Sequence, residues 1–203
     1  DTVRVSLTED PEFESPVVKT LINRYANRTE ASGIKPISNY PIDPFGYYKR
    51  VAVEVGNFGG DNVPRVITDI STVKIAVPKD LKCVGHFYLP ELDKWKMNDQ
   101  GCDYIFSGSN PIPFMLPNGL KEILAYDTWN NQEDQKNKLP AIDLCQLKEK
   151  AVLHENLNFL LLSSDSVAEA IPYLNNELPL VIVLFSNSEH QMQAIRRAFV
   201  SLI

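Results

Sequence analysis

Two apolar runs in the last third of the chain constrain its fold more than any other feature. They read LNFLLLSS over residues 157–164 and LPLVIVLF over residues 178–185. Runs that are apolar on both faces are typical of parallel strands covered on both sides. Segments with a helical pattern follow them at 165–177 and 187–203. Because strand–helix–strand connections of this kind are right-handed, the pattern predicts a parallel β-α-β-α unit.

Both predicted helices begin with residues that commonly cap helices. Ser164 or Asp165 precedes the first helix, and Asn187 or Ser188 precedes the second. In the second helix, apolar residues recur at helical spacing and predict a buried stripe. The stripe consists of Met192, Ile195, Phe199 and Leu202.

The middle of the chain has the composition of β-strands. Residues 49–56 (KRVAVEVG), 64–78 (PRVITDISTVKIAVP) and 81–90 (LKCVGHFYLP) are rich in β-branched and aromatic side chains. Short, turn-like links between them favour antiparallel neighbours. We therefore expect a mixed α/β (α+β) fold with one mixed sheet. Its N-terminal half would be rich in antiparallel strands, its C-terminal part would be the β-α-β-α unit, and helices would flank both.

Three further helices are expected from local signals. The first has Ser15 as its N-cap, Pro16 at its first position and Gly33 as its stop. The other two lie at 119–129 and 139–156, where apolar residues again recur at partly helical spacing.

The length of 203 residues fits a single domain over residues 1–203. Residues 130–138 (NNQEDQKNK) contain no apolar side chain and predict an exposed connection. The alternative is therefore a division into an antiparallel-rich part at 1–129 and a β-α-β-α part at 139–203, joined by that connection.

Charge and composition argue against several classes of protein. The formal net charge is −6, and no basic cluster is longer than Arg196–Arg197, so the chain gives no strong nucleic-acid signal. No apolar run approaches the roughly 18 residues that span a bilayer. Three widely spaced cysteines favour reduced thiols and an intracellular location. The first residue is Asp1, which is expected of a processed chain or of a piece of a longer protein. The sequence leaves the oligomeric state open.

The stretch GNFGGDN at 56–62 resembles a phosphate-binding loop at first sight. Such loops open a helix, whose N-terminus holds the phosphate. Here residues 63–67 (VPRVI) follow, and their composition predicts another strand. We therefore interpret 59–62 as a hairpin turn, with Phe58 exposed at its tip as a contact residue.

The cysteines and histidines form no recognisable zinc-binding or catalytic motif. Cys83, His86 and Cys102 would need a fourth zinc ligand from far away, such as Cys145 or His154. In an extended strand Cys83 and His86 also point to opposite faces. A thiolate pair of Cys102 with His86, or of Cys145 with His154, lies in no recognisable signature. We expect no metal and no cofactor.

A charged group in the β-rich region has the composition of a metal-dependent nuclease site. Glu54, Asp69 and Lys74 would face one another across a hairpin. Their spacing departs from the usual acid–x–Lys arrangement, so solvated charges on the outer face are the favoured interpretation.

Aromatic side chains gather in loops that prolines stiffen, at 39–49 and 86–97. Such loops suit the binding of another protein, because tyrosine and tryptophan lose little entropy when they dock. The leading prediction is a non-enzymatic protein-binding or assembly domain of a larger protein or complex. Its contact residues would be Tyr40, Phe45, Tyr47, Tyr48, Phe58 and Trp95.

The alternative prediction is a hydrolase or an anion-binding enzyme. In open α/β sheets, ligands collect beyond the carboxyl ends of the strands. This places a site near 163–165 and 186–190, where backbone N–H groups would favour an anion. Its residues would be Ser164, Asp165, Asn187 and Ser188.

Overall fold

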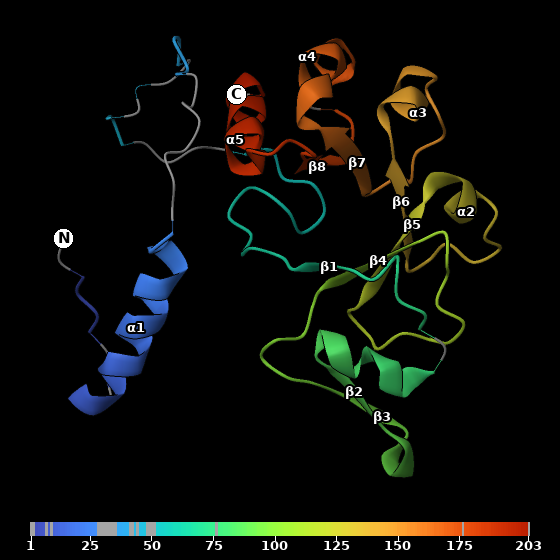
Figure 1. Ribbon diagram of the computed structural model, residues 1–203. Coiled ribbons are helices and arrows are strands. Elements are labelled where there is room, and N and C mark those ends of the chain that lie inside the picture. The colour runs from blue at the N-terminus through green and yellow to red at the C-terminus, as the bar shows by residue number, and fades with distance from the viewer. Residues whose placement is uncertain are drawn as a thin grey trace. The chain divides into compact units, whose positions relative to one another are not determined.

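A computed structural model describes residues 3–6, 8, 10–27, 36–40, 43, 45–47, 52–75, 77–175 and 177–202 (Figure 1). The chain divides into two compact units, Asp1–Asn39 and Tyr40–Ile203, which we describe separately.

The first unit contains the 3-10 turn η1 (Pro11–Phe13) and the helix α1 (Glu14–Tyr25). The predicted N-terminal helix is therefore confirmed, but its N-cap is Phe13 instead of Ser15. No residue of α1 is buried, and Val17 and Ile22 are 43% and 46% exposed. Gly33 lies outside the described residues.

The second unit is built on a parallel sheet. In the described part of the chain this sheet has six strands in the order β1-β4-β5-β6-β7-β8, and each pairs in parallel with its neighbours. Their bounds are β1 (Ile67–Asp69), β4 (Tyr104–Gly108), β5 (Lys121–Ala125), β6 (Lys138–Ile142), β7 (Asn158–Ser163) and β8 (Leu180–Phe185). A second, antiparallel sheet consists of β2 (His86–Leu89) and β3 (Lys94–Met97).

Helical segments connect these strands or, in the case of α5, follow the last of them. They are η2 (Pro78–Val84), η3 (Pro90–Leu92), α2 (Tyr126–Asn130), α3 (Leu144–Lys148), η4 (Ser164–Ser166), α4 (Val167–Ala170), η5 (Ile171–Tyr173) and α5 (Gln191–Ser201). The mixed α/β class is confirmed, as are the two C-terminal strands and their parallel pairing. Among the described residues of the N-terminal half, antiparallel pairing occurs in the β2–β3 hairpin and in an isolated bridge between Val55 and Phe58, because β1, β4 and β5 join the parallel sheet.

Two predicted helices begin as strands instead. Within 119–129 the structure forms β5 and then the short α2, and within 139–156 it forms β6 and then the short α3. A strand buried on both faces and a short helix after it together give apolar residues at spacings of three and four, which resembles one longer helix. Ile123 and Leu124, on opposite faces of β5, are both buried.

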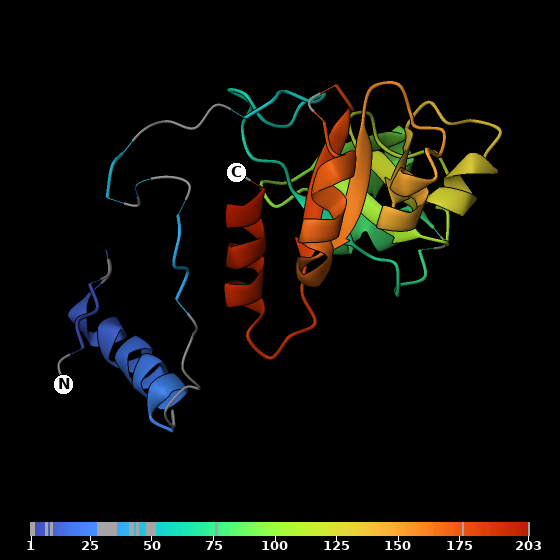
Figure 2. The ribbon, with the colours of Figure 1, turned by 90° about the horizontal axis from the view of Figure 1, so that it is seen from above.

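The sheet separates two apolar layers, because side chains alternate between its faces. On one face, Leu160 and Leu162 of β7 pack with residues of α3, α4 and α5. Figure 2 shows α5 beside α4 and the strands β7 and β8. On the other face, Tyr104, Ile123 and Phe159 form a second cluster that includes Phe58. We call this second face the inner face.

The connections between the strands explain why the two faces are covered differently. Right-handed crossovers between parallel strands that are added in chain order all lie on the same side of the sheet. The inner face therefore receives no crossover helix. Part of the 52–66 segment packs against it instead, through Val55 and Phe58.

Candidate ligand sites at the carboxyl edge of the sheet

Serine residues follow four of the six parallel strands. Ser71 comes two residues after β1, Ser109 directly after β4, Ser164 directly after β7 and Ser186 directly after β8. The carboxyl ends of parallel strands meet at one edge of a sheet, and this edge is where α/β folds bind ligands.

The predicted serine-rich site is assembled from two neighbouring strands. Ser163 of β7 is in register with Phe185 of β8, so Ser164 and Ser186 leave the sheet side by side. The Ser186 side chain is buried, and its hydroxyl accepts the N–H of Ser188 at 3.2 Å. The Ser163 hydroxyl accepts the N–H of Asp165 at 3.4 Å. The hydroxyl oxygen of Ser164 is buried and has no hydrogen-bond partner among the described residues.

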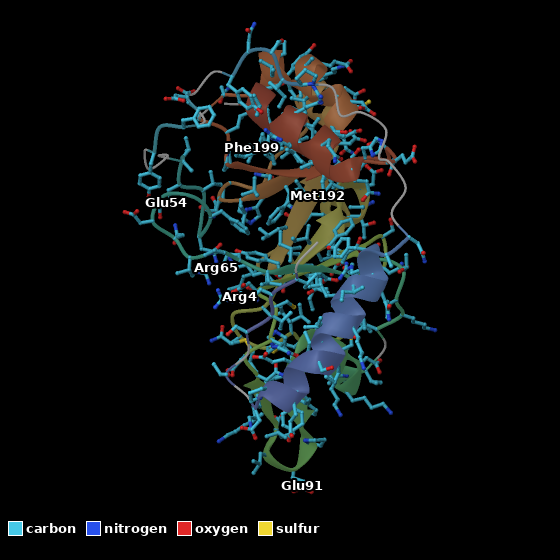
Figure 3. All side chains as sticks on the ribbon, turned by 60° about the vertical axis from the view of Figure 1, so that its left-hand side comes forward. Arg4, Glu54, Arg65, Glu91, Met192 and Phe199 are labelled. Carbon is cyan, nitrogen blue, oxygen red and sulfur yellow. The ribbon has the colours of Figure 1, made fainter. Side chains whose placement is uncertain are left out.

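The structure modifies the predicted caps of the last helix. α5 begins at Gln191 with His190 as its N-cap, so Asn187 and Ser188 belong to the preceding turn. The predicted stripe of α5 is also only partly inward. Met192 and Phe199, both labelled in Figure 3, are 77% and 51% exposed, and the buried residue of this helix is Ala198.

A second cavity at the same edge was not predicted. It measures about 470 Å³ and lies between the loops that follow β1 and β4. Its lining consists of Ser71, Thr72, Val73, Lys74, Ile75, Ser109, Asn110, Pro111 and Pro113. Hydroxyl groups, an amide and one ammonium group therefore line this space, which we call the Lys74 cavity.

Hydrogen bonds hold the two loops of the Lys74 cavity in place. The Oδ1 atom of Asp69 accepts both the N–H and the hydroxyl of Ser71, at 2.9 and 2.7 Å. The side-chain amide of Asn110 donates to the carbonyl of Ser71 at 3.3 Å, which ties the second loop to the first. The hydroxyl and amide donors of this cavity are thus presented from loops that are linked to each other.

The nuclease-like trio is not assembled as expected. The predicted hairpin does not form, because in the described part of 49–78 only Ile67–Asp69 is a strand. Glu54 accepts a hydrogen bond from Asn62, and Asp69 holds Ser71. Of the three residues, Lys74 alone lines a described cavity at the carboxyl edge.

The 56–62 stretch forms turns that pack against the inner face. Val55 and Phe58 exchange two backbone hydrogen bonds of 3.0 Å, and a turn closes from the carbonyl of Gly59 to the N–H of Asn62. The turn at 59–62 is thus present, although regular strands do not flank it. Phe58 is half-buried against Tyr104, so it is not the exposed tip that the sequence suggested.

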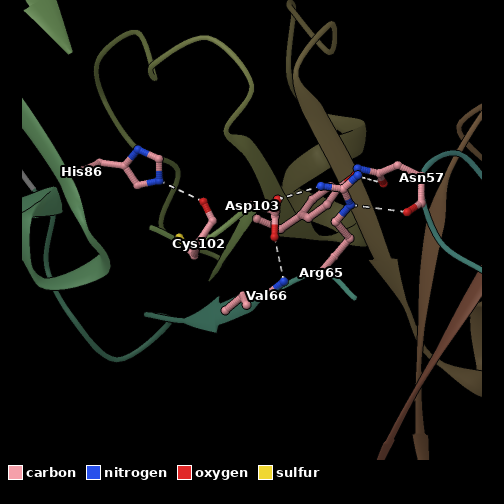
Figure 4. A network of polar contacts seen from close by, with 7 residues as sticks. Asn57, Arg65, Val66, His86, Cys102 and Asp103 are labelled. Atoms are coloured by element: carbon pink, nitrogen blue, oxygen red, sulfur yellow. Dashed lines mark hydrogen bonds and ion pairs between the residues drawn. The ribbon is translucent and has the colours of Figure 1, made fainter. Parts of the chain in front are cut away.

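A polar network ties this turn to β1 and β4 (Figure 4). Arg65 pairs with Asp103 at 3.2 Å and donates to the carbonyl of Asn57 at 3.5 Å. The second oxygen of Asp103 accepts the N–H of Val66 at 2.8 Å. The hydroxyl of Tyr104 donates to Asn57 at 2.5 Å. The polar groups of the turn are therefore engaged with the chain's own residues.

The cysteine–histidine combinations show no reactive arrangement. His86 is buried, and its Nε2 atom lies 2.8 Å from the carbonyl oxygen of Cys102, a contact with the backbone and not with the thiol. Burial raises the pKa of the Cys102 thiol, which disfavours the thiolate. Cys145 is exposed, whereas the ring of His154 packs on Trp129. Among the described residues, no group of three His, Cys, Asp or Glu side chains is placed to hold a metal ion.

The predicted contact aromatics have different surroundings. Phe45 and Tyr47 are 98% and 96% exposed. Tyr40 lies under the guanidinium of Arg196, which also donates to its hydroxyl. Tyr48 lies outside the described residues. Phe58 packs on the inner face, and Trp95 packs on the core cluster beside the β2–β3 hairpin.

Trp95 was predicted to contact a partner, but its ring packs on other aromatic rings of this chain. It stacks on Phe114 with ring centroids 6.5 Å apart and also contacts Tyr88 at 5.2 Å. These rings fix the hairpin to the chain's own core.

Within the described residues, no helix combines the length and the apolar character that crossing a bilayer requires.

Comparisons with known proteins give relatives that cover nearly the whole chain. A protein described as 4-hydroxy-3-methylbut-2-en-1-yl diphosphate synthase (flavodoxin) from Phocaeicola vulgatus is 29% identical over 201 residues, which is 97% of this chain and 28% of that protein. Proteins with the same description from Bacteroides fragilis and Parabacteroides distasonis are 26% and 25% identical and cover 94% and 100% of this chain. No protein-family model and no solved structure matches.

The chain spans between 26% and 30% of the length of these curated relatives. The relatives are described as enzymes, and their similarity extends over 94% or more of the chain. The prediction of a non-enzymatic binding or assembly domain is therefore wrong. It depended on the absence of a catalytic motif and on aromatic loops, and two of those rings, Phe58 and Trp95, pack on the chain's own core.

Proposed function

We propose that this chain is part of an enzyme that binds a diphosphate ester, and that the carboxyl edge of the sheet binds the diphosphate group. The observation that carries the proposal is the near-complete coverage of the chain by synthases whose description names 4-hydroxy-3-methylbut-2-en-1-yl diphosphate. The predicted location of an anion site at this edge agrees with the general position of ligands in α/β folds.

Within that edge, the Lys74 cavity has the chemistry that a diphosphate requires. Its ammonium group supplies positive charge, and the hydroxyls of Thr72 and Ser109 supply hydrogen-bond donors. Hydrogen bonds to a charged group contribute about 1.5–3 kcal/mol each. Lys74 and the donors around it therefore supply the contacts that would orient the anion.

The Ser164 hydroxyl is the second place at which this edge offers a donor. It is buried without a partner among the described residues, and leaving a buried hydroxyl unsatisfied costs about 1–3 kcal/mol. A ligand oxygen that accepts its hydrogen would remove that cost. Asp165 and Glu189 nearby are acidic, so the Lys74 cavity is the better match for the diphosphate.

Titration of the chain with inorganic pyrophosphate, followed by calorimetry, tests the proposal. We expect saturable binding that weakens about tenfold to a hundredfold in Lys74→Ala, because one charge-assisted contact is lost. Lys96→Ala is the matched control, since Lys96 is an exposed lysine on β3. Equal binding by all three proteins, or no binding by the unmodified chain, would refute the diphosphate site.

A second measurement separates the two parts of the edge. Ser164→Ala should leave pyrophosphate binding unchanged and raise the unfolding temperature, because the unsatisfied hydroxyl is removed. With 4-hydroxy-3-methylbut-2-en-1-yl diphosphate as the ligand, the same variant should also keep the affinity of the unmodified chain, because β7 lies about 14 Å from β4 across the sheet. Weaker binding of that ester would show that the site extends beyond the Lys74 cavity.

A further inference from the structure

Glu122 is a buried carboxylate that the proposed diphosphate site does not use. It is the second residue of β5, and its side chain is 1% exposed. Its Oε1 atom accepts the hydroxyl of Ser107 at 2.5 Å and the N–H of Ile112 at 2.7 Å. These contacts fasten the β4–β5 connection to the sheet, and both of them use the same oxygen.

The other oxygen of Glu122 receives no hydrogen bond from any residue that the structure describes. Lys138 of β6 is its partner in register, but the Lys138 ammonium donates to Gln132 at 2.6 Å and forms no described ion pair with Glu122. That oxygen is not among the buried polar atoms that lack a partner, so it keeps access to the space beside it. It can therefore accept a hydrogen bond from a molecule that enters that space.

Glu122 also lines a cavity of about 580 Å³, within the range that small-molecule sites occupy. One wall is formed by residues 111–116, which include Ile112 and Phe114. The rest of the lining is polar and consists of Glu122, Gln132, Asp134, Asn137 and Lys138. Two carboxylates and one ammonium group leave this lining with a net negative charge.

The apolar wall of this cavity is held from outside. Phe114 stacks on Trp95 with an interplanar angle of 18°, and Ile112 is buried and bonded to Glu122. The space beside the carboxylate is thus bounded by groups with fixed positions, as ligand sites usually are.

We propose that this cavity binds a small ligand that carries an ammonium or guanidinium group on an apolar body. Its N–H group donates to the Oε2 atom of Glu122, and Asp134 adds a second negative charge. Its apolar part lies against the wall of residues 111–116. A neutral ligand of the same shape leaves the carboxylate uncompensated, so both the charge and the N–H donor are required.

A matched panel of probes tests these requirements on the full chain. The probes are n-butylammonium, n-butanol of the same shape without the charge, and tetramethylammonium, which is charged but has no N–H donor. Binding is measured by the shift of the Ile112 amide resonance, because that N–H donates to the same carboxylate. We expect a saturable shift with n-butylammonium only.

Two variants assign the effect to the carboxylate. Glu122→Gln keeps an oxygen for Ser107 and Ile112 but removes the charge, and it should weaken n-butylammonium binding about tenfold to a hundredfold. Glu133→Gln is the control, since Glu133 is an exposed acid outside the cavity lining.

The proposal is overturned if n-butanol or tetramethylammonium shifts the Ile112 resonance as n-butylammonium does, or if n-butylammonium gives no saturable shift. Unchanged affinity in Glu122→Gln overturns it as well. Should that variant fail to fold, the three probes still decide the question on the unmodified chain. Pyrophosphate binding at the Lys74 cavity is independent of all these outcomes.

Discussion

The hydroxyl of Tyr104 donates to the side-chain oxygen of Asn57 at 2.5 Å and thereby joins β4 to a turn 47 residues earlier in the chain. The neighbouring Phe58 ring lies 5.2 Å from the Tyr104 ring and 5.6 Å from the Phe159 ring. The glycine-rich turn therefore covers part of the inner face of the sheet, and its role is structural.

Stability at high pH should depend on Tyr104. Burial raises the pKa of its hydroxyl above the ordinary 10.0, so the folded state keeps the proton that the unfolded state loses. The stabilisation is complete below the unfolded pKa and is lost as the pH rises through the folded value. Tyr104→Phe should thus lose less stability than the unmodified chain as the pH rises above about 10, in urea unfolding at each pH.

The same variant has the opposite effect at neutral pH. It leaves Asn57 without its donor, which should lower the free energy of unfolding by about 1 kcal/mol. Burial also raises the pKa of the Cys102 thiol above its ordinary 9.0. The stability that this thiol contributes is lost above about pH 9, and this loss should be the same in the variant. An identical pH dependence in both proteins would contradict the assignment to Tyr104.

The variant Phe58→Ala tests whether this ring anchors the 52–66 segment to the inner face of the sheet. The ring is half-buried between Tyr104 and Phe159, so its removal should cost about 2–4 kcal/mol of unfolding free energy. Val63→Ala in the same segment is the control, because Val63 is 63% exposed and its truncation should change stability by less than about 0.5 kcal/mol. Equal effects in chemical denaturation would show that Phe58 does not anchor the segment.

Gly59 should be the least replaceable glycine of the turn. Its φ is +70°, and a Cβ atom there would lie 2.1 Å from the carbonyl oxygen of Val53. Gly119 has a φ of +93°, and a Cβ atom there would have no neighbour within 4 Å, so Gly119→Ala incurs only the backbone strain of about 1–2 kcal/mol. Gly59→Ala should cost about 1–3 kcal/mol beyond that, measured by urea unfolding. A smaller loss for Gly59→Ala than for Gly119→Ala would mean that the 52–60 backbone adjusts freely.

The C-terminal unit was predictable because its strands are long and apolar on both faces. The strands β7 and β8 that formed within these runs are each six residues long, and their pairing placed Ser164 beside Ser186 at one edge. β5 and β6 were not predictable as strands. Both are five residues long and begin with lysine, and a short helix follows each of them within one residue. The apolar residues of strand and helix together therefore recur at spacings that are typical of one longer helix.

The Lys74 and Glu122 cavities depend on pairings that local patterns do not contain. β1 is only three residues long and pairs with β4, which begins 35 residues after β1 ends. Lys74 and Ser109 approach each other only through that pairing. The sequence predicted a helix over 119–129, on which an acid such as Glu122 would ordinarily face solvent. The structure forms β5 there instead, and Glu122 is buried because β5 lies within the sheet.

The order of the strands in the sheet also determines when each part of the core can form. From β4 to β8 every strand pairs with the next one in the chain, so these strands can be added one at a time as the polypeptide emerges from the ribosome. Phe58 is synthesised early, but its partner Phe159 follows about 100 residues later. Phe58 can pack on Tyr104 as soon as β4 is in place, but its contact with Phe159 stays open until β7 is added. That interval is the stage of folding at which chaperone binding or aggregation would act on this chain.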